Sequence, residues 1–172
     1  MRSAQDMMSG SQGNAQGHEH STKTVQFISF RVGEQEFAID IMAVREIKGW
    51  TDTTTLPNQE EYLLGVLNLR GTIVPIYDLR CRFGLGLTVA TRSHVVIIVS
   101  VLDRTIGLLV DAVSDILTVN SNEIRPVPEM EKSVSNEFLS GLITIGETMV
   151  VLLSLETLFA QRPSEDASAV AA

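Results

Sequence analysis

Few side chains of this sequence have the types and spacing that enzymes use for catalysis. Cys81 is the single cysteine, and a neighbouring histidine could turn it into a nucleophile by holding its thiolate. Two of the three histidines, His18 and His20, lie in a stretch rich in Ser, Gln and Gly, so only His94 could serve as that base. A lone thiol in a folded domain is usually inert. The sequence therefore predicts a protein that is not an enzyme and has no catalytic residue.

Metal and cofactor sites are equally hard to find. The segment GHEH (17–20) carries two histidines, but a closed metal site needs four ligands, and this tail offers no fixed third and fourth. The segment RFGLGL (82–87) contains glycines, yet it lacks the strand-to-helix setting in which glycines cradle a phosphate. Small β-barrels also fill their interiors with side chains, which leaves no cofactor cavity. We therefore expect no metal and no cofactor.

Composition narrows the classes of partner. The chain has 172 residues, of which 44% are hydrophobic and 20% charged, as in an ordinary folded protein. Thirteen Lys and Arg against 21 Asp and Glu give a net charge of −8, which repels nucleic-acid phosphates and anionic lipids. A nucleic-acid-binding β-barrel, the rival from another class, is disfavoured for this reason. No window has the length or apolarity of a signal peptide or a membrane span, so we expect a cytoplasmic protein without direct membrane insertion.

The two ends of the chain differ in composition from the middle. Residues 1–24 have few apolar side chains, and residues 161–172 are small and polar after a proline. Such segments cannot bury enough apolar surface to offset the entropy of ordering them. We predict two flexible tails that are dispensable for folding, and a folded part over residues 25–160.

The folded part reads as many short strands. Two predicted hairpins are of similar size, and a short stretch with helical spacing follows each of them. The first hairpin has strands at 25–32 and 36–40 around Gly33, the second at 94–101 and 104–110 around Leu102 and Asp103, and the predicted helices are 41–47 and 111–116.

The two halves of the sequence repeat each other. Residues 43–47 can be laid over 112–116, and residues 64–69 over 140–145, with an offset that grows from 69 to 76. The growing offset predicts an insertion in the second half, in a loop at 129–137. The repeat predicts two similar barrels packed side by side, the first over about 25–93 and the second over about 94–160. It leaves open whether the first strand is exchanged between them.

The repeat also isolates one residue, Arg70. In the stretch NLRGTIVPIYDLR (68–80) this arginine stands at a turn, and its counterpart in the second half is Gly146. The hairpin can therefore close without an arginine. Two roles remain for Arg70, a local ion pair with Glu46 or Asp78 and a contact with a partner, for which the donors and flat faces of arginine are well suited.

Four segments carry a resemblance to a known family. GVLNLRGTIVPIYDLR (65–80), FAIDIMAVREI (37–47), GLLVDAVSDIL (107–117) and IRPVPE (124–129) resemble CheW, the adaptor family of bacterial chemotaxis. The resemblance covers about residues 25–160. It implies an all-β fold with short helices, in which two SH3-like five-stranded β-barrels pack side by side. It also implies a non-catalytic scaffold that couples methyl-accepting chemoreceptors to the regulatory domain of the histidine kinase CheA.

The resemblance further implies a receptor-facing groove between the barrels, and it assigns six residues to that groove. They are Val44, Glu46, Gly65, Arg70, Val95 and Gly107. The family also implies a protein that is a monomer in isolation, joins rings with the kinase, and lies in the cytoplasm at receptor arrays on the inner face of the membrane. The side chains of the kinase contacts stay unassigned. A paralogous adaptor for a receptor and kinase outside chemotaxis stays open as the alternative.

Overall fold

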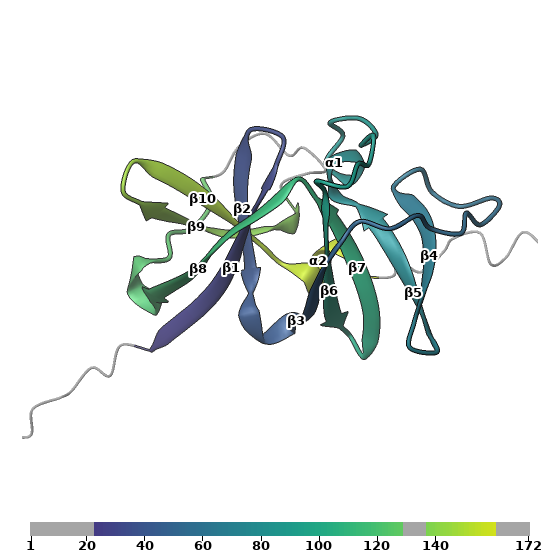
Figure 1. Cartoon of the computed structure of the whole chain (residues 1–172). Helices are drawn as coiled ribbons and strands as arrows, with labels where there is room; N and C mark the ends of the chain where they lie inside the picture. The colour runs from purple at the N-terminus through teal and green to yellow at the C-terminus, as the bar shows by residue number, and fades with distance from the viewer. Residues whose placement is uncertain (1–22, 129–136, 161–172) are drawn as a thin grey trace, which may run out of the picture.

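Two five-stranded sheets lie side by side and make up nearly all of the fold (Figure 1). A computed structural model describes residues 23–128 and 137–160 of the chain. The expectations for the tails at 1–24 and 161–172 and for the loop at 129–137 lie outside these residues, apart from positions 23, 24 and 137. The fold is mostly β with few short helices, as predicted.

Each sheet has the same internal order of strands. Sheet A has the order β8-β1-β2-β10-β9, with β1 (Thr24–Val32), β2 (Gln35–Asp40), β8 (Ala112–Asn120), β9 (Leu139–Ile145) and β10 (Thr148–Leu153). Sheet B has the order β3-β6-β7-β5-β4, with β3 (Val44–Gly49), β4 (Leu63–Leu69), β5 (Thr72–Asp78), β6 (Val95–Val101) and β7 (Arg104–Val110). All neighbours are antiparallel except β2 with β10 and β5 with β7, which are parallel.

The repeat is confirmed in the order of elements. The unit β4, β5 and α1 (Leu79–Arg82) recurs 76 residues later as β9, β10 and α2 (Leu155–Leu158). The hairpin β1–β2 recurs as β6–β7, with an offset of 69 residues between the starts of β2 and β7.

The two predicted helices are wrong. Of 41–47, only η1 (Ile41–Ala43) is helical, as one turn of 3-10 helix, and β3 begins at Val44. The stretch 111–116 falls mainly in strand β8. Both stretches are too short for helical spacing to decide their structure, and each pairs with the first strand of a hairpin, β3 with β6 and β8 with β1. The backbone hydrogen bonds of these pairings override the local pattern.

The hairpins are exchanged between the two halves of the chain. Hairpin β1–β2 completes the sheet built from β8, β9 and β10, and hairpin β6–β7 completes the sheet built from β3, β4 and β5. The expected boundary between residues 93 and 94 therefore does not separate the strands of one sheet from those of the other. A whole hairpin, rather than the first strand alone, crosses over.

The exchanged hairpins have apolar side chains on both faces. Phe30 and Ile39 belong to a central core cluster that β6 and β7 share, whereas Phe27 and Ala38 belong to a second cluster inside sheet A. Strands β6 and β7 divide their side chains in the same way between the central cluster and a third cluster inside sheet B. Burial on both faces explains the unbroken apolar run in β6.

One buried carboxylate fixes the junction after β5. Asp78 is fully buried and caps α1, where its Oδ1 accepts hydrogen bonds from the backbone N–H of Arg80 (3.1 Å) and from Oγ1 of Thr88 (2.7 Å). Its Oδ2 accepts a third bond from the backbone N–H of Thr88 at 2.7 Å. The residue at the repeat-related position, Ser154, caps α2 with its side chain. Asp78 therefore ties the loop after α1 to the end of the strand.

Replacing Asp78 tests this assignment. We expect Asp78→Ala to lower the free energy of unfolding by about 3 kcal/mol, because it leaves three hydrogen-bond donors without their acceptor. The matched control is Ser154→Ala, which removes an ordinary helix cap and should cost about 1 kcal/mol. Urea denaturation of both variants measures the difference, and equal losses would contradict the anchoring role of Asp78.

Candidate functional site

Arg70 occupies a strained position in a tight turn. Leu69 pairs with Thr72, so Arg70 and Gly71 form a two-residue turn between β4 and β5. The φ angle of Arg70 is +51°, in the left-handed region that favours glycine, and Gly146 has +61° at the equivalent position of the second half. Arg70 thus occupies a backbone position that glycine, at Gly146, occupies in the second half of the chain.

The guanidinium of Arg70 is oriented by Glu46. Arg70 Nη2 lies 2.7 Å from Glu46 Oε2, and the two side chains are 75% and 32% exposed. The pair joins the β4–β5 turn to β3, so it spans the two edge strands of sheet B. The hydrogen bond from Arg70 is the main cause that lowers the pKa of Glu46. The pair is therefore intact at neutral pH and is lost as the pH falls through that lowered pKa.

The expected ion pair with Glu46 is present, yet it leaves other N–H donors of the Arg70 guanidinium available for a partner. An exposed pair of this kind contributes little to stability. The guanidinium has five N–H donors, and the side chain keeps most of its surface in solvent. The two roles considered for Arg70 are compatible, because Glu46 can hold the side chain in place for a partner.

The two valines assigned to the groove lie at different ends of sheet B. Val44 begins β3 and pairs with Val99, whereas Val95 begins β6 and pairs with Gly49. Val95 and Val99 are about 13 Å apart along the strand. Both Val44 and Val95 are half-buried and pack against the central cluster. Val44 and Glu46 pair with adjacent β6 residues, Val99 of the central cluster and Ile98 of the cluster inside sheet B, so they lie on opposite faces of β3.

The two glycines assigned to the groove, Gly65 and Gly107, are buried positions where an added Cβ would overlap neighbouring atoms. Cross-strand pairing places Gly65, Ile76, Gly107, Ile98 and Glu46 in one row across all five strands. Both glycines are buried, and a Cβ on Gly107 would overlap the Ile76 side chain. Of the six groove residues, these two therefore act through close packing rather than through side-chain contact.

Gly65 allows sheet B to close on itself. After β3 the chain returns at Thr54, which exchanges backbone hydrogen bonds of 3.0 and 2.9 Å with Val66 of β4. A Cβ on Gly65, whose φ is +145°, would collide with the Thr54 carbonyl oxygen. Sheet A closes in the same way, because Arg125 exchanges backbone hydrogen bonds with Leu142 of β9.

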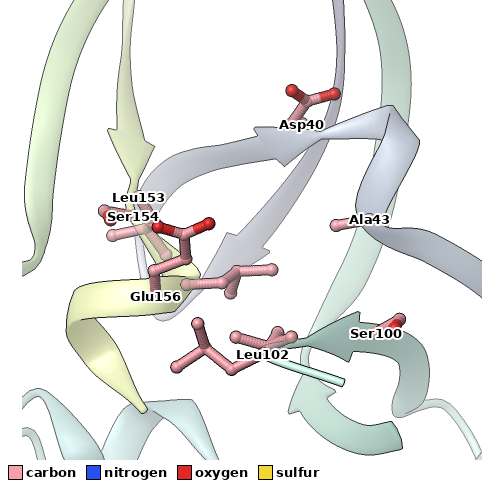
Figure 2. Close-up of a pocket in the computed structure, with 9 residues that line it drawn as sticks. Asp40, Ala43, Ser100, Leu102, Leu153, Ser154 and Glu156 are labelled. Atoms are coloured by element: carbon pink, nitrogen blue, oxygen red, sulfur yellow. The ribbon is translucent and has the colours of Figure 1, made fainter. Parts of the chain in front are cut away.

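A pocket that sequence reasoning missed opens beside Ala43, between the two sheets (Figure 2). Its volume is about 260 Å³. Sheet A and the start of α2 contribute Asp40, Leu153 and Glu156 to its lining, and sheet B contributes the end of β6 and Leu102 of the turn that follows. The signal that could have found it is Leu102, an apolar residue where a hairpin turn is expected.

The residues considered for catalysis show no arrangement for it. Burial raises the pKa of the Cys81 thiol, which disfavours the reactive thiolate. The ring of His94 accepts a hydrogen bond at Nδ1 from the backbone N–H of Thr91 (3.0 Å), and its Nε2 lies 3.4 Å from Asp111. Within residues 23–128 and 137–160, no three metal-binding side chains cluster and no helix has the length and apolarity to cross a membrane.

Comparison with known proteins decides the family. The CheW-like domain family matches residues 26–162. The chain belongs to the CheW family. A probable chemotaxis protein CheW of Rhizobium etli is 46% identical over 142 residues, which cover 83% of this chain and 92% of the relative. The chemotaxis protein CheW of Rhizobium meliloti is also 46% identical, over 84% of this chain and 91% of its own length.

The structural comparison agrees with that of the sequences. The crystal structure of the scaffolding protein TtCheW from Thermoanaerobacter tengcongensis superimposes with a TM-score of 0.75 at 30% identity. The match covers 81% of this chain and 95% of TtCheW. The predicted fold class and the prediction of a non-catalytic CheW scaffold of chemotaxis signal transduction are thereby confirmed.

The packing role of Gly65 is testable by stability. We expect Gly65→Ala to cost about 3 kcal/mol of unfolding free energy, because the new methyl group meets the Thr54 backbone. Gly71→Ala is the matched control. Gly71 also has a positive φ, of +86°, but a Cβ there would have no other atom within 4 Å, so only backbone strain of about 1 kcal/mol is added. Thermal or urea unfolding measures both, and equal losses would contradict the crowding at Gly65.

Proposed function

We propose that this CheW-family scaffold couples chemoreceptors to the histidine kinase CheA, and that the end of sheet B bearing Arg70 faces the receptor. The observation that carries the assignment of this surface is the exposed guanidinium of Arg70, held at a left-handed turn position and oriented by Glu46 at 2.7 Å. Backbone strain of this kind persists where a side chain is needed at that place.

The chemistry of this surface suits a protein partner. Arg70 offers N–H donors to carboxylates or backbone carbonyls of a partner, and its side chain is 75% exposed. Arginine at the centre of an interface often dominates the binding energy. A surface that holds an oriented, exposed cation can therefore recognise a receptor segment without any catalytic group.

The regulatory domain of CheA requires a surface of its own. An adaptor that joins two partners must bind both at once, so we assign the kinase to residues away from the Arg70 turn. We further propose that the chain is monomeric in isolation, joins rings with the kinase and works in the cytoplasm at receptor arrays. Of the six groove residues, Val44, Glu46 and Arg70 are the candidates for direct contact, and Gly65 and Gly107 support them.

The receptor contact is tested with Arg70→Ala. We expect the stability to change by no more than about 1 kcal/mol, because the residue is exposed. The affinity for a receptor cytoplasmic fragment should fall about thirtyfold, which corresponds to about 2 kcal/mol. Affinity for the isolated CheA regulatory domain should stay unchanged. Arg92→Ala, which removes an exposed arginine of the loop before β6, is the control and should alter neither affinity.

A second substitution separates folding from binding. Arg70→Gly introduces the residue of the equivalent turn, so it should fold at least as stably as Arg70→Ala while binding the receptor fragment equally poorly. Calorimetry and binding isotherms on the same samples provide both values. Lost stability with intact receptor binding would assign Arg70 to the fold instead.

The scaffold function itself is tested by reconstitution. CheA autophosphorylation is measured with receptor-containing membranes, with and without the protein. We expect receptor-controlled kinase activity to rise only when all three components are present, because the adaptor supplies contacts and no chemistry. Equal activity with and without the protein would refute the proposed coupling.

A further inference from the structure

The hairpin turns at corresponding ends of the two sheets differ in residue type and in backbone conformation, because both turn residues have positive φ in sheet B and only the first does in sheet A. Because β5 and β7 run parallel as neighbours, the turns that precede them lie at the same end of sheet B, and the same holds for β10 and β2 in sheet A. In sheet A both turns begin with glycine, Gly33 at φ +63° and Gly146 at φ +61°. In sheet B they begin with Arg70 at +51° and Leu102 at +49°.

Of the two non-glycine residues that begin these turns, Leu102 carries the larger cost in backbone strain. Leucine rarely adopts a left-handed backbone, and its side chain forms no hydrogen bond that could compensate. The next residue, Asp103, is also left-handed at φ +61°, as a two-residue hairpin turn of this type requires. The leucine is 54% exposed, so burial recovers only part of the cost. Local stability alone would favour the glycine that the repeat has at Gly33.

The pocket beside Leu102 has an apolar wall and an acidic mouth. Leu153 and Leu155 belong to the buried central cluster and line the pocket. Asp40 and Glu156 line it as well, both residues are exposed, and Figure 2 labels both among the lining side chains. Oδ1 of Asp40 also accepts a hydrogen bond from the backbone N–H of Met42 at 2.9 Å. The mouth is therefore negatively charged and complements a cation.

We propose that Leu102 and this pocket form a docking site for a receptor segment that presents an apolar side chain next to a lysine or arginine. The apolar side chain enters the pocket against Leu102, and its cationic neighbour meets Asp40 and Glu156. The site rests on the proposed function, because it is assigned to the receptor on two grounds. Ala43 of its lining directly precedes Val44, and the Leu102 turn lies beside the Arg70 turn in sheet B.

Leu102→Gly gives opposite changes in stability and binding. Removing the left-handed leucine should raise the Tm of the full chain by about 2–4 °C. The affinity for the receptor cytoplasmic fragment should fall about tenfold, and that for the CheA regulatory domain should stay unchanged. Leu85→Gly is the control, because Leu85 is 53% exposed in the loop after α1, and it should leave receptor affinity unchanged.

The charge of the mouth is tested separately. Glu156→Lys should weaken receptor binding about tenfold at low salt, and the loss should shrink as the ionic strength rises. Glu156→Gln should give a smaller loss in the same direction.

Two results would overturn the docking site. Unchanged receptor affinity of Leu102→Gly would remove Leu102 from the interface, and a lower Tm of the same variant would make it a packing residue. Unchanged affinity of Glu156→Lys would exclude a cationic partner segment. Failure of the unmodified protein to bind the receptor fragment would instead refute the proposed function, so the two failures are distinguishable.

Discussion

The parallel pairing of β2 with β10 and of β5 with β7 is the constraint on which the rest of the structure depends. Each pairing attaches a hairpin from one half of the chain to a sheet from the other half. The hairpins then lie between two cores and bury both faces, which requires the apolar runs of β1 and β6. Without these pairings the chain would have two three-stranded units, β8-β1-β2 and β3-β6-β7, and two separate hairpins, β9–β10 and β4–β5, each too small to bury its apolar surface.

The same pairing assembles the candidate site. Parallel neighbours begin at the same end of a sheet, so the turns before β5 and β7 are brought together although Arg70 and Leu102 are 32 residues apart in the sequence. Closure of the sheet at Thr54 and Val66 then brings β4 towards β3, where Arg70 meets Glu46. The recognition surface is thus a product of long-range strand pairing rather than of a local motif.

Sequence reasoning succeeded where a signal is local or repeated. The hairpins around Gly33 and around Leu102 followed from apolar runs and turn residues, and the repeat followed from aligned positions such as Gly65 and Gly141. It failed at 41–47 and 111–116, where a few apolar residues at helical spacing were outweighed by pairing with distant strands. The exchange of hairpins leaves no local trace, because both arrangements bury the same residues.

The candidate site was predictable in part for the same reason. The pairing of Arg70 with Glu46 was one of two roles considered for the arginine, and it is present. The strain at Arg70 and Leu102 and the pocket between the sheets depend on backbone angles and on the contact of distant elements, which single residues do not reveal. Separation of Val95 from the Arg70 end likewise follows only from the register of β6.

The exchange of hairpins also determines how the molecule responds to force. Two domains joined by a linker can hinge, so a displacement of a partner at one end is absorbed at the joint. Here the joint consists of backbone hydrogen bonds and a shared core, and bending it would break both. The protein is therefore expected to behave as a stiff strut, which passes a movement at one end to the other with little loss.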